Sequence, residues 1–420
     1  MDKQLEMPHI LSSLIECYHS SLGSLPGGAS VISARDNVIE QMKEVGIPSR
    51  KIEYWHYTDL PTLIKTIPAF ENEDKGSAVT PLFSKSPIFA TFNGKTLNNP
   101  QLEGVNSYRL AEALAQDQYV FNEEIAQDDF IGQLNTAFVT DGWLININAK
   151  TNFENPIELQ NIHTKGQSHS RSHVTIGGDS RVTIVERDLG DDQLSLTSSI
   201  NLLTIAENSE VSWVIVRDRD DHSLRFSKFQ SVLAKGAKLT LYVINVASQL
   251  NRQEIEVELQ GEKSDFQLRV INLLADKTHS DITMVVRHSE EQSTSNEIIR
   301  NVVTDHAKGA FQGMIKVSQK AQKTDARMAC NSLILSDFAE FNAKPELEIF
   351  ADDVACGHGA TVAEIDHNHL FYLMARGIPL PLARGLLVKA FVSELIDDIA
   401  QEDQQGVLES IIDSWLERNL

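Results

Sequence analysis

The spacing of apolar residues changes twice along the chain and divides it into three parts. The first part is helical, as residues 33–51 show, because their apolar residues recur at spacings of four and three: Val38, Met42 and Val45. Ser33 or Asp36 is a candidate cap for the start of this helix. Gly46 can take the left-handed conformation that ends a helix, and Pro48 prevents continuation.

The second part, from about residue 85 to 355, consists of short β-branched runs separated by polar turns. Five of these runs start 29, 28, 27 and then 45 residues apart: VTIVER (182–187), VSWVIV (211–216), LTLYVI (239–244), FQLRVI (266–271) and FQGMIKV (311–317). No convincing helix separates them, which disfavours a doubly wound α/β fold. A nearly constant period of this size is typical of a solenoid, and we predict a right-handed parallel β-helix. A long antiparallel sandwich would give a similar cadence and stays open here.

The third part, from about residue 366, is helical again. A short segment, LFYLMARGI (370–378), ends at Gly377. Two apolar stripes follow: Leu387, Phe391, Leu395 and Ile399, and then Leu408, Ile411, Ile412, Trp415 and Leu416. The stripes either pack only on each other or also present a docking surface. The pattern predicts a mainly β chain, with an N-terminal helical region (1–84), a β-helix core (85–365) and a C-terminal helical domain (366–420).

Charge and cysteine content restrict the possible partners and the compartment. The 420 residues carry a net charge of −22, which disfavours nucleic acid and anionic membrane surfaces as partners. No apolar run reaches the ~18 residues of a membrane span, and the N-terminus does not resemble a signal peptide. An odd, sparse set of cysteines, Cys17, Cys330 and Cys356, indicates a reducing cytoplasm without a disulfide framework.

One stretch, FADDVACGHGATV (350–362), combines a thiol and an imidazole two positions apart. On an extended strand Cys356 and His358 would point to the same face, where sulfur and nitrogen can bind one iron or zinc ion. Two ligands do not complete such a site, since zinc and iron–sulfur centres usually take four. The others would come from elsewhere in the fold or from another chain. The alternative is a structural Cys–His pair.

The other candidate residues carry weaker signals. Cys330 precedes Cys356 by close to one period of the solenoid, so the two belong either to neighbouring coils or to unrelated buried positions. Cys17 is expected to pack on an N-terminal helix. His367 and His369 open a helix, where residues two apart do not face each other.

The segment NGKT (93–96) resembles the end of a phosphate-binding loop, but Phe89 stands where that motif needs glycine. We therefore predict no ATP loop in this chain. The common signatures of hydrolases, zinc proteases and paired-cysteine sites are also absent from the sequence.

Two stretches of the chain resemble the SufB/SufD family of iron–sulfur cluster assembly proteins. GIPSRKIEYWHYTDL (46–60) is similar to the family's N-terminal pattern G-[LIF]-P-x-[RK]-[RK]-x-E-x-W-[RK]-Y-T-x-L, with His56 in place of the usual Lys or Arg. KPELEIFADDVACGHGATVAEID (344–366), followed by LFYLMARGI, is close to the signature of the SufD branch. Gly359 fits this branch, because the SufB branch usually has an acid there.

The resemblance implies a non-enzymatic scaffold subunit of the SUF complex. Such subunits pair with SufB through their β-helices and bind a SufC ATPase through the C-terminal helical region, and a homodimer is a further possibility. The resemblance assigns His358, less firmly Cys356 and last Cys330 to a transient iron–sulfur cluster at the subunit interface. It also implies reduced flavin in the complex, at a site that no residue here indicates. The competing hypothesis is a β-helix enzyme that hydrolyses or cleaves polysaccharide, a class that is usually exported.

Overall fold

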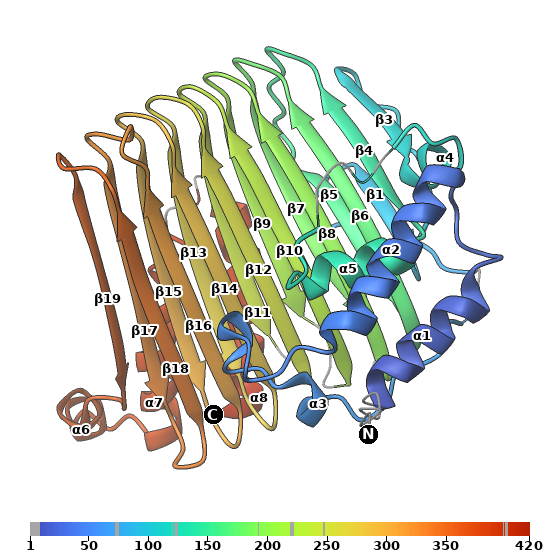
Figure 1. Cartoon of the computed structure of the whole chain (residues 1–420). Helices are drawn as coiled ribbons and strands as arrows, with labels where there is room; N and C mark the ends of the chain where they lie inside the picture. The colour runs from blue at the N-terminus through green and yellow to red at the C-terminus, as the bar shows by residue number, and fades with distance from the viewer. Residues whose placement is uncertain are drawn as a thin grey trace.

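Two β-sheets face each other along most of the chain and form a solenoid (Figure 1). The computed structural model describes residues 9–71, 75–119, 121, 125–191, 193–218, 222–246, 248–397, 399 and 402–420. Sheet A has ten strands, in the spatial order β19-β17-β15-β13-β11-β9-β7-β5-β1-β2. Sheet B has nine, in the order β18-β16-β14-β12-β10-β8-β6-β4-β3.

The strands of each sheet are long and nearly equal over the solenoid proper. Those of sheet A are β1 (Ile88–Phe92), β2 (Lys95–Thr96), β5 (Ile157–His163), β7 (Arg181–Gly190), β9 (Glu210–Asp218), β11 (Lys238–Val246), β13 (Asp265–Leu274), β15 (Thr294–Val303), β17 (Asp325–Ile334) and β19 (Ala355–Ala363). Those of sheet B are β3 (Val105–Arg109), β4 (Asp141–Ile147), β6 (Gly166–Ile176), β8 (Ser195–Ile205), β10 (Ser223–Leu233), β12 (Leu250–Leu259), β14 (His279–His288), β16 (Lys308–Val317) and β18 (Glu340–Ile349).

Each coil of the solenoid gives one strand to each sheet, and neighbouring coils pair in parallel from β4 and β5 onward. The predicted parallel β-helix is therefore confirmed, and the antiparallel sandwich is wrong. The first end of the solenoid is built differently. There the two-residue strand β2 runs antiparallel to β1, and β3 runs antiparallel to β4.

The arrangement also explains why the last step between the recognised runs is longer than the others. The first four runs lie in β7, β9, β11 and β13, which are consecutive strands of sheet A. The fifth run, 311–317, lies in β16 of sheet B, so that step adds about half a coil to a whole one.

Alternate residues of every strand point into the solenoid and fill it. Because side chains alternate across a strand, each strand contributes every second residue to the interior core, as Leu241, Val270 and Ile299 do from sheet A and Ile255 and Met284 from sheet B. Stacking coil upon coil makes this core continuous from Trp143 in β4 to Cys330 in β17.

Short N-terminal helices cover the outer face of sheet B (Figure 1). They are α1 (His9–Ser21), α2 (Ala29–Val45), the 3-10 helix η1 (Glu53–Trp55), α3 (Leu60–Leu63), α4 (Leu110–Ala115) and α5 (Phe130–Phe138). The layer packs on outward side chains such as Leu224 and Phe226. Two of these helices, α4 and α5, lie inside the range predicted to be solenoid, between β3 and β4.

Helix α2 tests the predicted caps. The helix starts after Gly28 without a side-chain cap, so the expectation that Ser33 or Asp36 caps it is wrong. The predicted end is confirmed, because Gly46 follows Val45 with a φ of 85°.

The C-terminal helices are α6 (His367–Ala375), α7 (Leu380–Ser393) and α8 (Glu402–Asn419). Val388, Val392 and Trp415 join outward residues of sheet A, such as Val214 and Ile244, in one buried cluster. The two apolar stripes thus pack against the solenoid as well as against each other. None of the helices in the described ranges is long and apolar enough to cross a membrane.

Candidate functional site

The solenoid ends in a coil that no further coil covers. Its strands β18 and β19 are the last strands of their sheets, so each is paired along one edge only. Large apolar side chains are exposed around this open end: Phe338, Ile349, Phe350 and Val362, of which Phe338 is 70% and Phe350 62% exposed. A soluble monomer rarely leaves such a patch beside two free strand edges, so this surface is suited to contact another molecule.

Strand β19 carries Cys356 and His358 and presents both on its inward face. Cys356 packs against the interior core and is partly buried. His358, two residues further on, shares that face because side chains alternate along a strand. Its register partner in β17 is Met328, a core residue. His358 itself is exposed, because there is no following coil to cover it. The sequence prediction that the two side chains share a face is confirmed.

A row of side chains runs from His358 back into the solenoid. His358 lies beside Met328 of β17, and Met328 lies beside Glu297 of β15. Neither Met328 nor Glu297 was singled out in the sequence. Counting back one coil at a time would have found both, but only with the register that the structure supplies.

The two cysteines of the terminal coils differ in environment. Cys330 is fully buried on β17, and burial raises the pKa of its thiol to about 12. Cys356 is more accessible, although burial and, secondarily, the charges of Asp325 and Glu297 raise the pKa of its thiol too. Cys330 lies on the neighbouring coil, as one alternative held, but its register partner is Ala360 rather than Cys356. Cys356 is therefore the thiol that an approaching ligand meets first.

The two glycines beside His358 have no role in packing within this chain. A Cβ added to Gly357 or Gly359 would have no heavy atom within 4 Å. Their absence of side chains leaves both positions of β19 open toward solvent, which lets another backbone or a bulky inorganic ligand come close to the strand.

The remaining candidates take structural positions. Cys17 is half-buried on α1 and packs within the N-terminal layer, as expected. The segment NGKT forms the turn between β1 and β2, in which Asn93 and Gly94 both have positive φ, as a tight hairpin requires. His367 and His369 lie in the exposed first turn of α6. In the described part of the chain, no three His, Cys, Asp or Glu side chains are grouped closely enough to hold a metal ion.

Comparison with known proteins agrees with the geometry. Residues 159–391, more than half of the chain, match the family model described as "SUF system FeS cluster assembly, SufBD core domain". The chain is 26% identical to the iron–sulfur cluster assembly protein SufD of Escherichia coli, over 89% of this chain and 90% of that protein. The SufD of Bacillus subtilis is 24% identical, over 90% and 92% of the two chains.

A third relative, an iron–sulfur cluster assembly SufBD family protein of Synechocystis, is 25% identical over 91% of this chain and 90% of its own length. The match to the family model covers the solenoid from β5 through β19 and ends within α7. The family predicted from the two sequence stretches is confirmed: the chain belongs to the SufBD family of the SUF system for iron–sulfur cluster assembly.

Proposed function

We propose that this chain is a non-enzymatic scaffold subunit that pairs with a second SufB/SufD-type chain and shares a nascent iron–sulfur cluster with it. The open terminal coil carries the proposal, because it places His358 and Cys356 between two unpaired strand edges and an exposed apolar rim. SufB is the partner that the resemblance implies. Family membership leaves no support for the alternative of a polysaccharide-cleaving enzyme.

The cluster is the cargo of this scaffold and must be handed on. Cys356 and His358 form only half of a four-ligand site, called here the half-site, which suits such transient binding. Two ligands from this chain hold the cluster less firmly than the four that a resident centre takes. A Cys356 thiol has to lose its proton before its sulfur can bind iron, and the raised pKa makes that loss harder. The exposed imidazole of His358 is the more available ligand, so we rank it first, Cys356 second and the buried Cys330 third.

The test is the substitution His358→Ala in the purified complex of this chain with its SufB and SufC partners. We expect normal folding and assembly, and cluster content reduced at least tenfold after anaerobic reconstitution, measured by iron, sulfide and absorbance. Cys356→Ser should lower cluster content less. Cys17→Ser, on the distant helix α1, is the control and should change nothing. Wild-type cluster content in His358→Ala would mean that the histidine is only structural.

We further propose that the C-terminal helices bind the ATPase, through residues other than those first expected. Trp415 and most of the stripe residues are buried against the solenoid. The apolar residues left exposed lie on α6 and the start of α7: Phe371, Tyr372, Met374, Leu380, Leu382 and Leu386. This exposed set, called here the α6–α7 surface, is large enough for a helix or loop of a partner. The reducing cytoplasm remains the proposed compartment.

A further inference from the structure

Six consecutive residues, 53–58, contact four neighbouring strands of sheet B. They belong to the N-terminal stretch that resembles the family pattern, and the proposed function gives that stretch no role. The contacts reach β12, β14, β16 and β18, which lie side by side in the sheet. We call this segment the strap.

The centre of the strap is a buried Trp–Arg contact. The guanidinium of Arg252, on β12, lies 4.4 Å from the ring centroid of Trp55, and both side chains are almost fully buried. A nitrogen of the same guanidinium donates to the backbone oxygen of Tyr54 at 2.9 Å. Trp55 also packs edge-to-face on Phe130 of α5. Burial away from water strengthens a cation–π contact of this kind.

The other contacts continue across the sheet one strand at a time. On β14, Asp281 accepts a hydrogen bond of 2.5 Å from the hydroxyl of Thr58 and an ion pair of 2.7 Å from Arg252. On β16, Gln312 donates to the backbone oxygen of Tyr54 at 3.1 Å. On β18, the ammonium of Lys344 lies 2.9 Å from the carboxylate of Glu53.

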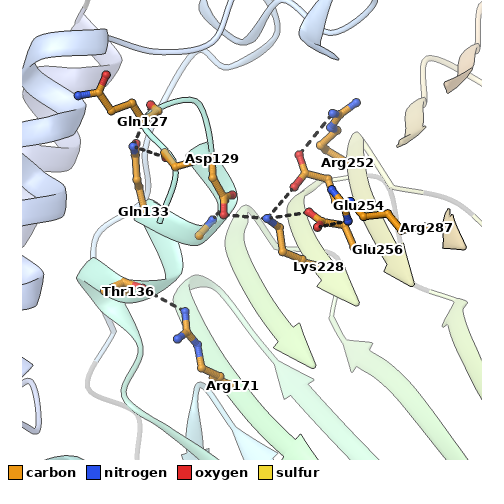
Figure 2. Close-up of polar contacts among 12 residues, drawn as sticks. Gln127, Asp129, Gln133, Thr136, Arg171, Lys228, Arg252, Glu254, Glu256 and Arg287 are labelled. Atoms are coloured by element: carbon orange, nitrogen blue, oxygen red, sulfur yellow. Dashed lines mark hydrogen bonds and ion pairs between the residues drawn. The ribbon is translucent and has the colours of Figure 1, made fainter. Parts of the chain in front are cut away.

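A charged network anchors the strap side of the sheet to the N-terminal layer (Figure 2). Arg252 contacts Glu254 at 3.4 Å, and Glu254 contacts Lys228 at 3.3 Å. Lys228 reaches Asp129 at 2.7 Å, and Asp129 in turn caps α5 by accepting a hydrogen bond from the backbone N–H of Gly132. The strap is therefore held at both sides, by α5 and by the strands beneath it.

The contacts explain which positions of the pattern matter. The side chains of Glu53, Trp55 and Thr58 make the cross-strand contacts, and these are the glutamate, tryptophan and threonine of the family pattern. His56, which departs from the pattern, has its ring against Tyr57. The side chain of His56 is exposed, so we expect this departure from the pattern to have little effect on the strap.

Strands in a solenoid contact only their nearest neighbours, and the last coil has just one neighbour. A transverse segment that ties it to three earlier coils supplies the restraint that the missing coil cannot. We propose that residues 53–58 position the terminal coil, β18 and β19, and so fix the geometry of the half-site on β19. The role of that coil in holding a cluster rests on the proposed function, whereas the restraint on its position does not.

The test is amide hydrogen exchange in the full-length chain carrying Thr58→Val. This change keeps the shape of the side chain and removes the contacts of its hydroxyl with Asp281 and with the ring nitrogen of His279, both on β14. We expect at least tenfold faster exchange over residues 340–363 and less than twofold change over 157–190, with faster alkylation of Cys356. Thr58→Ser, which restores the hydroxyl, should return both rates to wild type. A matched control is Thr62→Val, which removes a hydroxyl that donates to nearby Asp59 at 2.6 Å.

A second variant decides the question if Thr58→Val does not fold. Lys344→Met removes the ion pair with Glu53 of the strap and a second pair, at 3.1 Å, with Glu346 of β18, and should speed exchange in β18 two- to threefold. Faster exchange confined to residues 50–60, or equal in every strand, would overturn the strap as a positioning element. Exchange is measured without a cluster, so that result would leave the proposed function standing. Wild-type cluster content in His358→Ala would overturn the proposed function and leave the strap as a positioning element standing.

Discussion

Glu297 is an ionisable side chain that the solenoid buries completely. It lies on the inward face of β15, one row behind Met328 and two behind His358. Burial raises the pKa of its carboxyl to about 8, against weaker opposing effects of Ser295 and its own backbone N–H. Below that pH the folded chain holds Glu297 as a neutral acid, whereas in the unfolded chain it ionises near pH 4.5.

The sign of the resulting pH dependence follows from linkage. Since folding raises this pKa, the folded state binds the extra proton, and stability is lost as the pH rises from about 4.5 through about 8. We expect Glu297→Gln, which cannot ionise, to gain about 4 kcal/mol relative to the native chain between pH 5 and pH 9. Urea unfolding of both proteins at pH 5, 7 and 9 measures the difference, with exposed Glu417→Gln on α8 as the control. A constant difference across this range would contradict the prediction.

Residue-level prediction from the sequence succeeded where only local geometry was needed. The shared face of Cys356 and His358 follows from strand alternation alone. The neighbours Met328 and Glu297 depend on the register between coils, which shifts slightly from one coil to the next in this region and cannot be read from one strand. The buried state of Cys330 likewise depends on the coil that covers it.

Among the elements, the C-terminal helices differ in how much of their apolar surface is buried. The apolar stripe of α8 packs against the solenoid, whereas the shorter helix α6 has no buried side chain. Periodicity in the sequence identified both helices, but it could not say which stripe covers sheet A. Removing everything from residue 366 would uncover outward residues of sheet A such as Val214 and Ile244, so point substitutions are the cleaner probe.

We expect Phe371→Ser combined with Leu382→Ser to abolish retention of the ATPase by a tagged copy of this chain. Both residues are more than half exposed, so their loss should change the melting temperature by less than about 2 °C. Co-purification and scanning calorimetry are the measurements. Ile32→Ser, which removes a 43% exposed residue from α2, is the matched control. Undiminished ATPase in the double variant would move the docking site elsewhere.

For the molecule as a whole, the fold class could be predicted from the sequence, but the structure of the two ends of the solenoid could not. The regular spacing of the first four β-branched runs identified a solenoid because every coil has nearly the same length. The half-coil offset of β16 and the helices inserted between β3 and β4 were not predicted, since neither follows the repeat. The open end was not visible either, because a strand that lacks a neighbour has the same alternating pattern as one that has it.

If the chain pairs through that open end, a charge introduced at its apolar rim should weaken the pairing. Phe350→Asp should prevent association with a co-expressed SufB-type chain, because a carboxylate at the rim loses hydration when the partner covers it. Light scattering during size-exclusion chromatography measures the loss. Tyr108→Asp, at a residue 58% exposed on β3 at the opposite end, serves as the control. Equal association of both variants would exclude the open coil as the interface.

The unequal ends also limit what the chain can build. A solenoid that exposed similar free edges at both ends would add subunits head to tail and grow without limit into fibres. Here one end finishes in the two-residue strand β2 and the antiparallel strand β3, while the other offers two full-length edges. A subunit with full-length free strand edges at one end of its solenoid can pair through such edges only once. If the chain pairs as proposed, assembly through strand edges stops at two chains and does not continue into a filament.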